Sequence, residues 1–366
     1  MIYERAIRPI LFNFPPEAAH SGVLRVAGAL ARAGIVGRTV ERALSLEDER
    51  LAVSIAGMKF PNPIGLGAGM DKNAIALAFL GLLGFGSLEV GSVSLNPSKG
   101  NRNVPRLLRM PQEGALLVNY GVPNDGAGAV APRLQRYRRH APLGLSAPLG
   151  VSLVETNTGT QRSAPAVIEE LRKAAISMAP LSDYLTINLQ CPNSSVGPFA
   201  KASNLRALLG TLSDIGGMPP VFLKTAATTD ERLIDELAGV ACDFPFVRGI
   251  ALSVVMRRRF ATRGESHDAT MGSVTGGPLR ALALESLRAW YRRIDRQRLV
   301  LIGAGGISTG AQAYEFIRNG ASLAQLVTAL VYQGPSVARR IKSELLSEME
   351  RDGIANVHEA IGCAVA

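Results

Sequence analysis

The chain has 366 residues, of which 47% are hydrophobic, so it can bury one large core or two modest cores. Its 38 glycines and 21 prolines indicate many short connections within a globular protein. The net charge of +10 could favour nucleic acid, an anionic membrane or anionic ligands. We find no zinc-ligand spacing, helix-turn-helix pattern or interleaving of aromatic and basic residues, which argues against nucleic acid and against a metal site.

Cysteine usage and the N-terminal sequence bear on the cellular compartment. Cys191, Cys242 and Cys363 are too few and too scattered for a disulfide framework or a metal cluster, and they fit a reducing compartment. Residues 1–10 contain charged side chains and no secretory h-region, and no later apolar run approaches membrane-spanning length. We therefore expect a cytoplasmic protein, and peripheral contact with the inner face of the cell membrane stays open.

The first 42 residues differ in composition from the rest of the chain. They hold six arginines against three acidic residues, interleaved with aliphatic side chains, which suits short amphipathic helices. Two interpretations stay open: a helix pair packed on the main domain, or a basic lid that touches an anionic membrane surface. We predict an N-terminal helical extension over residues 1–45 and a main domain over residues 46–366.

From residue 51 onward, apolar strands alternate with helical segments. A small hairpin is predicted at 51–56 and 58–60, and an irregular excursion at 105–109 and 115–118. Strands are predicted within 62–73, 85–94, 149–154, 183–188, 220–225, 249–255, 299–307 and 323–330. Helices are predicted at 74–83, 131–139, 164–179, 203–215, 230–241, 310–319 and 335–351. This alternation indicates an α/β protein with a (β/α)8 TIM barrel. The alternative, a doubly wound sheet, lacks an early dinucleotide fingerprint.

A thiol between two carboxamides follows the predicted strand 183–188. The sequence Asn188-Leu-Gln-Cys191-Pro-Asn193 places Cys191 where the strand must end at a proline. Polar side chains at the C-terminal tip of a buried parallel strand are typical of active sites in α/β barrels, so Cys191 is the first candidate for a catalytic group. The alternative is a small buried hydrophobic residue, although two flanking carboxamides are poor core packing unless something polar binds there.

Three loops indicate a phosphate-binding site. Gly303-Ala-Gly-Gly306 lies between a predicted strand and a helix near the end of the barrel pattern, where many such barrels bind phosphate through backbone amides. Val327-Thr328, one strand later, and Thr275-Gly-Gly-Pro278 could complete the site. A tight turn between strand and helix is the alternative for each loop taken alone.

Lys72 and Lys224 lie at the ends of apolar strands, where a lysine is costly unless it meets an anion or a polarised carbonyl. The ordinary alternative is a surface lysine. Two inward lysines around a flavin would stabilise negative charge at its N1–C2 and N5–C4 carbonyl edges. In a phosphate-binding isomerase or aldolase without flavin, Lys224 would instead be a Schiff-base candidate.

Together these motifs resemble the dihydroorotate dehydrogenase family over roughly residues 50–345. The segments that carry the resemblance are 62–73, 85–94, 105–107, 183–193, the strand of Lys224, 275–279, 302–307 and 327–328. The N-terminus is similar to the extension of the membrane-associated class that reduces quinones, through Tyr3, Arg8, Leu11-Phe12, Pro15 and Ala19-His20.

The resemblance implies an FMN-containing barrel in which a base takes a proton from one substrate carbon while a hydride passes from the next carbon to flavin N5. Electrons would then reach a quinone at the N-terminal extension, in a reaction of pyrimidine biosynthesis. By position, the resemblance implies Cys191 and Lys72 as catalytic residues. Implied cofactor contacts are Ala68, Gly69, Lys72, Ser92, Ser152, Asn188, Lys224, Ser253, Gly276, Gly305, Gly306, Val327 and Thr328. Implied substrate contacts are Lys72, Val118, Asn119, Tyr120, Gly121, Asn188, Asn193 and Val254.

The chain departs from the family pattern around the substrate. Cys191 matches the soluble class of the family, whereas the membrane-associated class usually has serine before that proline. Two substrate-binding asparagines of the family fall on Val118 and Val254, and one that contacts the flavin falls on Ser152. Asn119 could replace Val118 after a register shift.

These departures leave two hypotheses open besides dihydroorotate oxidation. A diverged member of the family would remove a vicinal proton and hydride, or add them, on another small molecule. A non-catalytic barrel would use its basic N-terminus to dock on a membrane or a partner protein.

Overall fold

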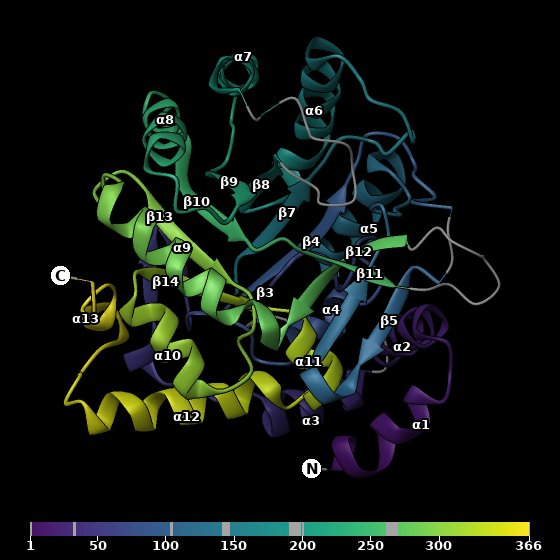
Figure 1. Ribbon diagram of the computed structural model, residues 1–366. Coiled ribbons are helices and arrows are strands. Elements are labelled where there is room, and N and C mark those ends of the chain that lie inside the picture. The colour runs from purple at the N-terminus through teal and green to yellow at the C-terminus, as the bar shows by residue number, and fades with distance from the viewer. Residues whose placement is uncertain are drawn as a thin grey trace.

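The protein, described here from a computed structural model, contains a closed barrel of parallel strands at its centre (Figure 1). The structure describes residues 2–31, 34–102, 105–140, 147–189, 199, 201–260 and 270–365. The spatial order of the strands is β10-β13-β14-β3-β4-β7-β8-β9. Their bounds are β3 (Ile64–Leu66), β4 (Ser87–Val93), β7 (Leu149–Leu153), β8 (Tyr184–Asn188), β9 (Val221–Ala226), β10 (Val247–Ser253), β13 (Val300–Ala304) and β14 (Ala321–Leu326). The predicted (β/α)8 barrel is confirmed.

Burial explains why these runs form the barrel. Every residue of β4 and β14 is buried, as expected for parallel strands that are covered on both faces. Helices surround the barrel (Figure 1). They are α4 (Leu77–Gly81), α5 (Ala127–His140), α6 (Ala164–Met178), α7 (Ala202–Ser213), α8 (Glu231–Cys242), α9 (Arg280–Arg293), α10 (Gly310–Arg318), α11 (Thr328–Gln333), α12 (Val337–Arg351) and α13 (Val357–Ala360).

The hairpin of β1 (Val53–Ile55) and β2 (Met58–Phe60) is antiparallel, as predicted. The Phe60 ring is buried, with its centre 6.5 Å from that of Tyr184 on β8. Tyr184 in turn packs edge-on against Phe222 on β9, with 5.3 Å between ring centres. These aromatic rings join the hairpin to the barrel core.

A second sheet accompanies the barrel, where the sequence predicted only an irregular excursion. It is antiparallel, with the order β11-β12-β6-β5. Its strands are β5 (Leu107–Met110), β6 (Ala115–Val118), β11 (Met256–Phe260) and β12 (Thr270–Gly276). The prediction was wrong because β6 pairs with a strand far along the chain, Val118 with Ser273, and local sequence patterns do not encode such pairing.

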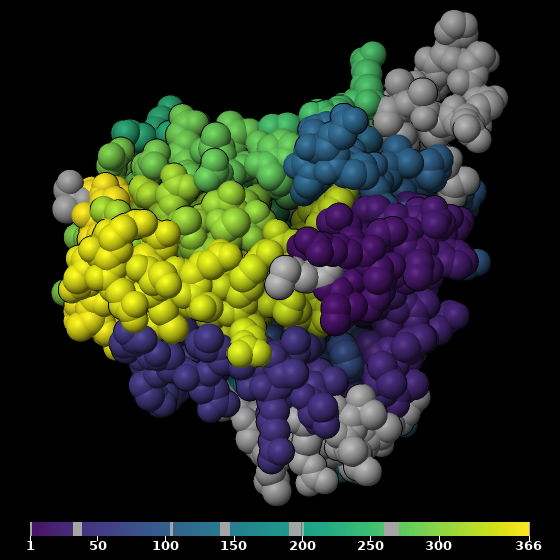
Figure 2. Space-filling model, turned by 90° about the horizontal axis from the view of Figure 1, so that it is seen from below, coloured from purple at the N-terminus to yellow at the C-terminus, as the bar shows by residue number. Residues whose placement is uncertain are grey.

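The N-terminal extension consists of a π-helical turn, η1 (Tyr3–Ile7), and helices α1 (Arg8–Phe12), α2 (Pro16–Ala31) and α3 (Gly34–Leu44). It lies beside the barrel, and the space-filling view shows it against the C-terminal part of the chain (Figure 2). The Tyr3 hydroxyl donates to the Val331 carbonyl at 2.7 Å, and Arg8 donates to the Tyr332 carbonyl at 2.9 Å. The helices thus pack on the barrel. Within the described ranges, none of the helices has the length and apolar character needed to cross a membrane.

Candidate active site

One large cavity lies at the C-terminal ends of the barrel strands, between the barrel, the second sheet and α2. Its volume is about 1030 Å³. Residues at or just beyond the ends of β3, β4, β8, β9, β10, β13 and β14 line it. This edge of the barrel is where enzymes of this architecture carry their catalytic groups.

Glycine backbones form one end of the cavity. Gly305 and Gly306 follow β13 with φ angles of 120° and 81°, and Gly276 ends β12 with a φ angle of 88°. These conformations favour glycine. A Cβ atom on Gly306 would also lie only 2.9 Å from the Cβ atom of Arg280. Without side chains, the backbone N–H groups of these loops are accessible to an anionic ligand such as a phosphate.

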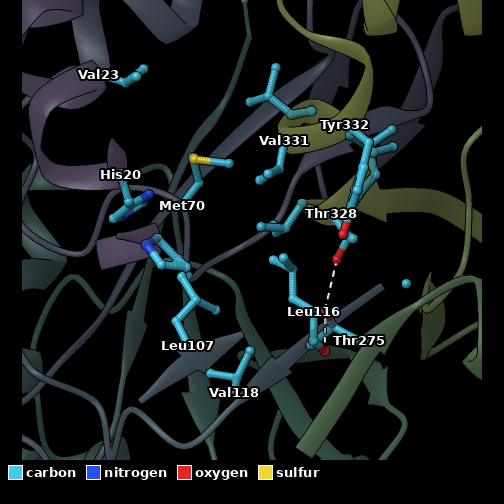
Figure 3. A pocket seen from close by; sticks show the side chains of 18 of the residues that line it. His20, Val23, Met70, Leu107, Leu116, Val118, Thr275, Thr328, Val331 and Tyr332 are labelled. Carbon is cyan, nitrogen blue, oxygen red and sulfur yellow. Dashed lines mark hydrogen bonds between the residues drawn. The ribbon is translucent and has the colours of Figure 1, made fainter. Parts of the chain in front are cut away.

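Two hydroxyl groups complete this end of the cavity. The Oγ1 atoms of Thr275 and Thr328 lie 2.9 Å apart and are hydrogen-bonded (Figure 3). The strand predicted at 323–330 is shorter than expected, because β14 ends at Leu326 and α11 begins at Thr328. We call the group of Gly276, Gly305, Gly306 and Thr328 the phosphate cup.

Polar side chains form the floor of the cavity on the barrel side. Asn188 Nδ2 donates to Ser92 Oγ at 3.2 Å, and Ser92 Oγ lies 2.8 Å from Ser152 Oγ. Asn188 Oδ1 and Ser273 Oγ are buried and have no hydrogen-bond partner among the described residues. Because buried polar atoms in proteins nearly always have partners, these two cavity-lining residues indicate that a polar ligand binds here.

Lys72 and Lys224 both line the cavity. Lys72 Nζ donates to the Gly69 carbonyl at 2.8 Å and lies 4.7 Å from the centre of the Tyr120 ring. The neighbouring Asp71 carboxylate accepts three backbone N–H groups of the following turn at distances between 2.7 and 3.2 Å. Burial raises the pKa of Asp71, and those hydrogen bonds oppose the rise. Hydrogen bonds within the loop therefore hold the backbone beside Lys72 in place.

An apolar tunnel leads from this polar region to the N-terminal extension. His20 of α2 faces the tunnel (Figure 3). Burial, and after it the charge of Lys72, lowers the pKa of His20 to about 4, so the imidazole is neutral near pH 7. Apolar side chains that line the tunnel include Val23, Met70, Leu107, Leu116, Val118 and Val331 (Figure 3). Such a tunnel suits an uncharged, largely apolar ligand.

The structure brings most of the predicted cofactor contacts into this one cavity. Those that line it are Ala68, Gly69, Lys72, Ser92, Asn188, Lys224, Ser253, Gly276, Gly305, Gly306, Val327 and Thr328. Ser152 is fully buried behind Ser92 and does not line the cavity. The predicted base Cys191 and the predicted substrate contact Asn193 lie outside the described residues.

The predicted substrate contacts divide into two groups. Val118, Tyr120 and Val254 line the cavity, whereas Asn119 and Gly121 do not. Asn119 is buried, and its Oδ1 accepts a hydrogen bond from the Asn101 side chain at 2.7 Å. The register shift that would let Asn119 replace Val118 is therefore not observed.

Among the polar residues that line the cavity and that the sequence did not predict are Ser273 and Gln325. Gln325 Nε2 donates to the buried carboxylate of Glu89 at 3.0 Å, inside the barrel. A polar amide near the end of an otherwise apolar run was the signal that could have identified Gln325. Ser273 belongs to the second sheet, which had not been predicted.

Fold and cavity together define a class of enzyme, a (β/α)8 barrel with a glycine-lined cup, two cavity-lining lysines and an apolar tunnel under an N-terminal helix. The model of the family described as dihydroorotate dehydrogenase matches residues 50–349. The chain belongs to the dihydroorotate dehydrogenase family and is an oxidoreductase of the kind that acts on CH–CH bonds with a flavin.

Individual relatives are similar to the chain over nearly its whole length. The chain is 36% identical to dihydroorotate dehydrogenase (quinone) of Sphingopyxis alaskensis over 364 residues, which cover 97% of this chain and 95% of that protein. It is 34% identical to the protein of the same name in Mycobacterium tuberculosis, over 98% and 97% of the two chains. The solved structure of DHODH from Eimeria tenella in complex with ferulenol has a TM-score of 0.79 and 29% identity, and covers 95% of each chain.

Proposed function

We propose that the chain is an FMN-dependent dehydrogenase that removes a proton and a hydride from adjacent carbons of a small cyclic substrate, such as dihydroorotate, and passes the electrons to a quinone. The observation that carries this proposal is the continuity of one cavity from the phosphate cup, past Lys72 and Lys224, to the tunnel beneath α2. The relatives from Sphingopyxis and Mycobacterium bear the name of a quinone-dependent dihydroorotate dehydrogenase, which supports the same reaction.

FMN fits the polar part of the cavity. The phosphate cup offers backbone N–H groups and the Thr328 hydroxyl to a phosphate. Asn188 Oδ1 and Ser273 Oγ have no partner within the described part of the chain and can bond polar atoms of the ring system or its side chain. Lys72 and Lys224 would place positive charge beside the carbonyl edges of the ring. When bound, FMN supplies the hydride acceptor and transfers electrons onward to the quinone.

Cys191 is the proposed base. In the sequence it lies three positions after Asn188, the cavity-lining last residue of β8. A thiol has an ordinary pKa of about 8.5, far nearer neutrality than a serine hydroxyl, and so needs less help to accept a proton. Lys72, Asn188 and Asn193 would bind the polar groups that acidify and orient the substrate.

The quinone would enter below the N-terminal extension. The tunnel presents apolar walls and the neutral imidazole of His20, as a quinone headgroup with an apolar tail requires. The outer surface of the extension carries apolar side chains that are 55–79% exposed, Ile2, Ile10, Phe14 and Val26. An apolar face beside arginines suits peripheral contact with an anionic membrane surface, from which a quinone could enter. We infer a cytoplasmic protein with such contact at the inner face of the cell membrane.

Anaerobic flavin bleaching tests the proposal. Protein purified with its flavin should lose visible absorbance when a panel substrate, such as dihydroorotate, dihydrouracil or a simple lactam, is added, and a soluble quinone should restore it. Cys191→Ala should slow bleaching by about 100-fold or more, the ordinary effect of losing a general base. Cys242→Ala is the matched control, since Cys242 on α8 does not line the cavity. A protein that binds no flavin, or a Cys191→Ala variant that bleaches at the normal rate, contradicts the proposal.

A further inference from the structure

Helix α11 lies between the phosphate cup and the N-terminal extension and contacts both. Its first residue, Thr328, belongs to the cup, and Thr328 Oγ1 lies 2.9 Å from Thr275 Oγ1 on β12 (Figure 3). Tyr332 follows one helical turn later, is only 8% exposed and lines the tunnel. Because backbone hydrogen bonds join successive turns of a helix, a displacement of Tyr332 also displaces Thr328.

The Tyr332 hydroxyl attaches α11 to the hairpin that β5 and β6 form. It donates to the Ala115 carbonyl at 2.6 Å and accepts from the Met110 N–H at 3.2 Å, and these two residues pair with each other across the hairpin. Ala115 also pairs with Gly276 of the cup, and a Cβ atom on Gly276 would lie 2.4 Å from the Gly114 carbonyl oxygen. Tyr332 therefore holds together the two sides of the phosphate cup, α11 and the second sheet.

The extension contacts the C-terminal part of the same helix. The Tyr3 hydroxyl donates to the Val331 carbonyl at 2.7 Å, and Arg8 donates to the Tyr332 carbonyl at 2.9 Å. The Phe12 ring packs edge-on against the Tyr332 ring, with 5.6 Å between the ring centres and 78° between the planes. All three contacts require α11 in the position in which the Tyr332 hydroxyl bonds the hairpin.

A phosphate in the cup would favour the same position of α11, because it would contact Thr328 on one side and Gly276 on the other. We propose that α11 couples cofactor binding to docking of the extension, with Tyr332 as the positioning residue. This inference rests on the proposed function, since it takes FMN as the ligand of the cup. Bound FMN strengthens docking of the extension, and docking strengthens FMN binding by the same factor, because linkage is reciprocal. The tunnel wall that α2 provides is then held most firmly when the flavin is in place.

Amide hydrogen exchange of the whole chain, with FMN bound and after its removal, tests the coupling without turnover. FMN should slow exchange in α1 and α2 by about fivefold or more, the lower end of ordinary coupling between two sites. Exchange in α7 is the internal control, since none of the residues of α7 lines the cavity, and it should stay the same. Equal rates in α1 and α2 with and without FMN overturn the inference. An equal change in α7 also overturns it, because the whole barrel would then respond to the flavin.

Tyr332→Phe keeps the ring that Phe12 contacts and removes the hydroxyl that bonds the hairpin. The dissociation constant of FMN, measured by flavin fluorescence, should rise by about fivefold, and FMN should protect α1 and α2 from exchange much less than in the wild-type protein. Tyr314→Phe on α10 is the matched control. Tyr314 is also buried and donates to Asp352 Oδ2 at 3.0 Å, but it does not line the cavity, so both measurements should stay at their wild-type values.

The outcomes separate this inference from the proposed function. If Tyr332→Phe weakens FMN binding but leaves the FMN-dependent protection of α1 and α2 intact, Tyr332 only shapes the cup and the coupling is overturned. The same conclusion follows if Tyr314→Phe changes both measurements as much as Tyr332→Phe does. In either case flavin bleaching by a substrate can still succeed, so the proposed function survives. A protein that binds no FMN overturns both proposals.

Discussion

The barrel and the N-terminal extension differ in how much of their apolar surface they bury. Among the largest fully buried side chains are Trp290, Tyr184 and Phe222, all of which belong to the barrel and its helices. The extension instead contributes many of the large hydrophobic side chains that are exposed in the described part of the chain. It is attached to the barrel by the buried side chains of Leu24 and Ala27 and by hydrogen bonds from charged groups to backbone carbonyls. Barrel stability and docking of the extension should therefore respond to different substitutions.

The largest effect is expected from a cavity in the barrel core. Phe222→Ala removes a fully buried ring that packs against Tyr184, and should lower the free energy of unfolding by about 3–5 kcal/mol. Denaturant unfolding followed by tryptophan fluorescence measures this, because Trp290 is itself fully buried.

The matched change in the extension should have almost no effect on that transition. Val26→Ala trims a side chain that is 60% exposed, so the expected change in unfolding free energy is below about 0.5 kcal/mol. The same variant should bind anionic vesicles more weakly. Equal destabilisation by the two substitutions would mean that the extension is part of the cooperative core.

Removing the main polar attachment of the extension should have a smaller effect than Phe222→Ala. Arg109 on β5 donates to the carbonyls of Leu11, Phe12 and Phe14 at 3.2, 3.0 and 2.9 Å, and its guanidinium lies 4.4 Å from the centre of the Phe12 ring. Arg109→Ala should weaken docking of the extension by about 2–3 kcal/mol, as expected for the loss of hydrogen bonds from a charged group. Amide hydrogen exchange should then speed up in α1 and α2 and stay unchanged in the barrel strands.

Reactions of the cofactor give the second readout for this variant. Reoxidation by a quinone should slow in Arg109→Ala, while flavin reduction by the substrate should change little. Arg25→Ala, on the exposed side of α2, serves as the control. The contrary result is a barrel that unfolds at a lower denaturant concentration in Arg109→Ala while amide exchange in α1 and α2 stays normal. That result would mean that Arg109 stabilises the barrel and does not hold the extension.

The sequence could predict the barrel better than the second sheet or the docking of the extension. The barrel strands are short apolar runs bounded by turns, so hydrophobic pattern alone located them, and the hairpin at Val53–Phe60 with them. The second sheet escaped because β5 and β6 pair with β11 and β12 from a distant part of the chain. Whether the extension packs on the barrel also depended on contacts from Arg109 and Tyr3 to backbone carbonyls, which have no sequence signature.

The candidate site divides in a similar way. The phosphate cup could be predicted because glycine marks backbone conformations that other residues avoid, as at Gly305 and Gly306. Lys72 and Lys224 could be predicted because a lysine ending an apolar strand needs a partner. The direction of the Asn119 side chain could not, because it is set by Asn101, whose position depends on loops brought together only by the fold.

Acid should loosen the extension before it affects the barrel. Burial, followed by the charge of Lys72, lowers the pKa of His20 from its ordinary value of 6.5 to about 4. The undocked state therefore binds the proton more readily than the docked state, so docking is fully stabilised above pH 6.5 and weakens as the pH falls toward 4. We expect a loss of about 1 kcal/mol at pH 5, discounted for partial solvent access.

Limited proteolysis of residues 2–31 at pH 7 and pH 5 measures this change. Cleavage should increase at pH 5 in the wild-type protein, and His20→Asn should make the two rates similar. An unchanged pH dependence in His20→Asn would assign the effect to another titratable group.

A small effect is expected where the extension meets the substrate side of the cavity. Glu17 on α2 accepts from Arg106 Nη2 at 2.6 Å and from Arg106 Nε at 3.1 Å. The Arg106 guanidinium lies 5.6 Å from the centre of the Tyr120 ring, and Lys72 Nζ lies 4.7 Å from the same centre. An unbroken set of contacts thus runs from the N-terminal extension to the lysine that would hold the substrate.

Glu17→Gln keeps the shape of this side chain and removes its charge. The ion pair is partly exposed, so the expected loss is about 0.5–1 kcal/mol, or a two- to fivefold rise in the KM for the substrate with little change in the quinone step. Steady-state kinetics with each substrate varied in turn separates these constants, and Glu41→Gln on α3 is the control. A change confined to the quinone step would instead mean that α2 acts on the tunnel alone. In that case Tyr120 and Lys72 would be positioned by the barrel, and the division between the two regions would extend into the active site itself.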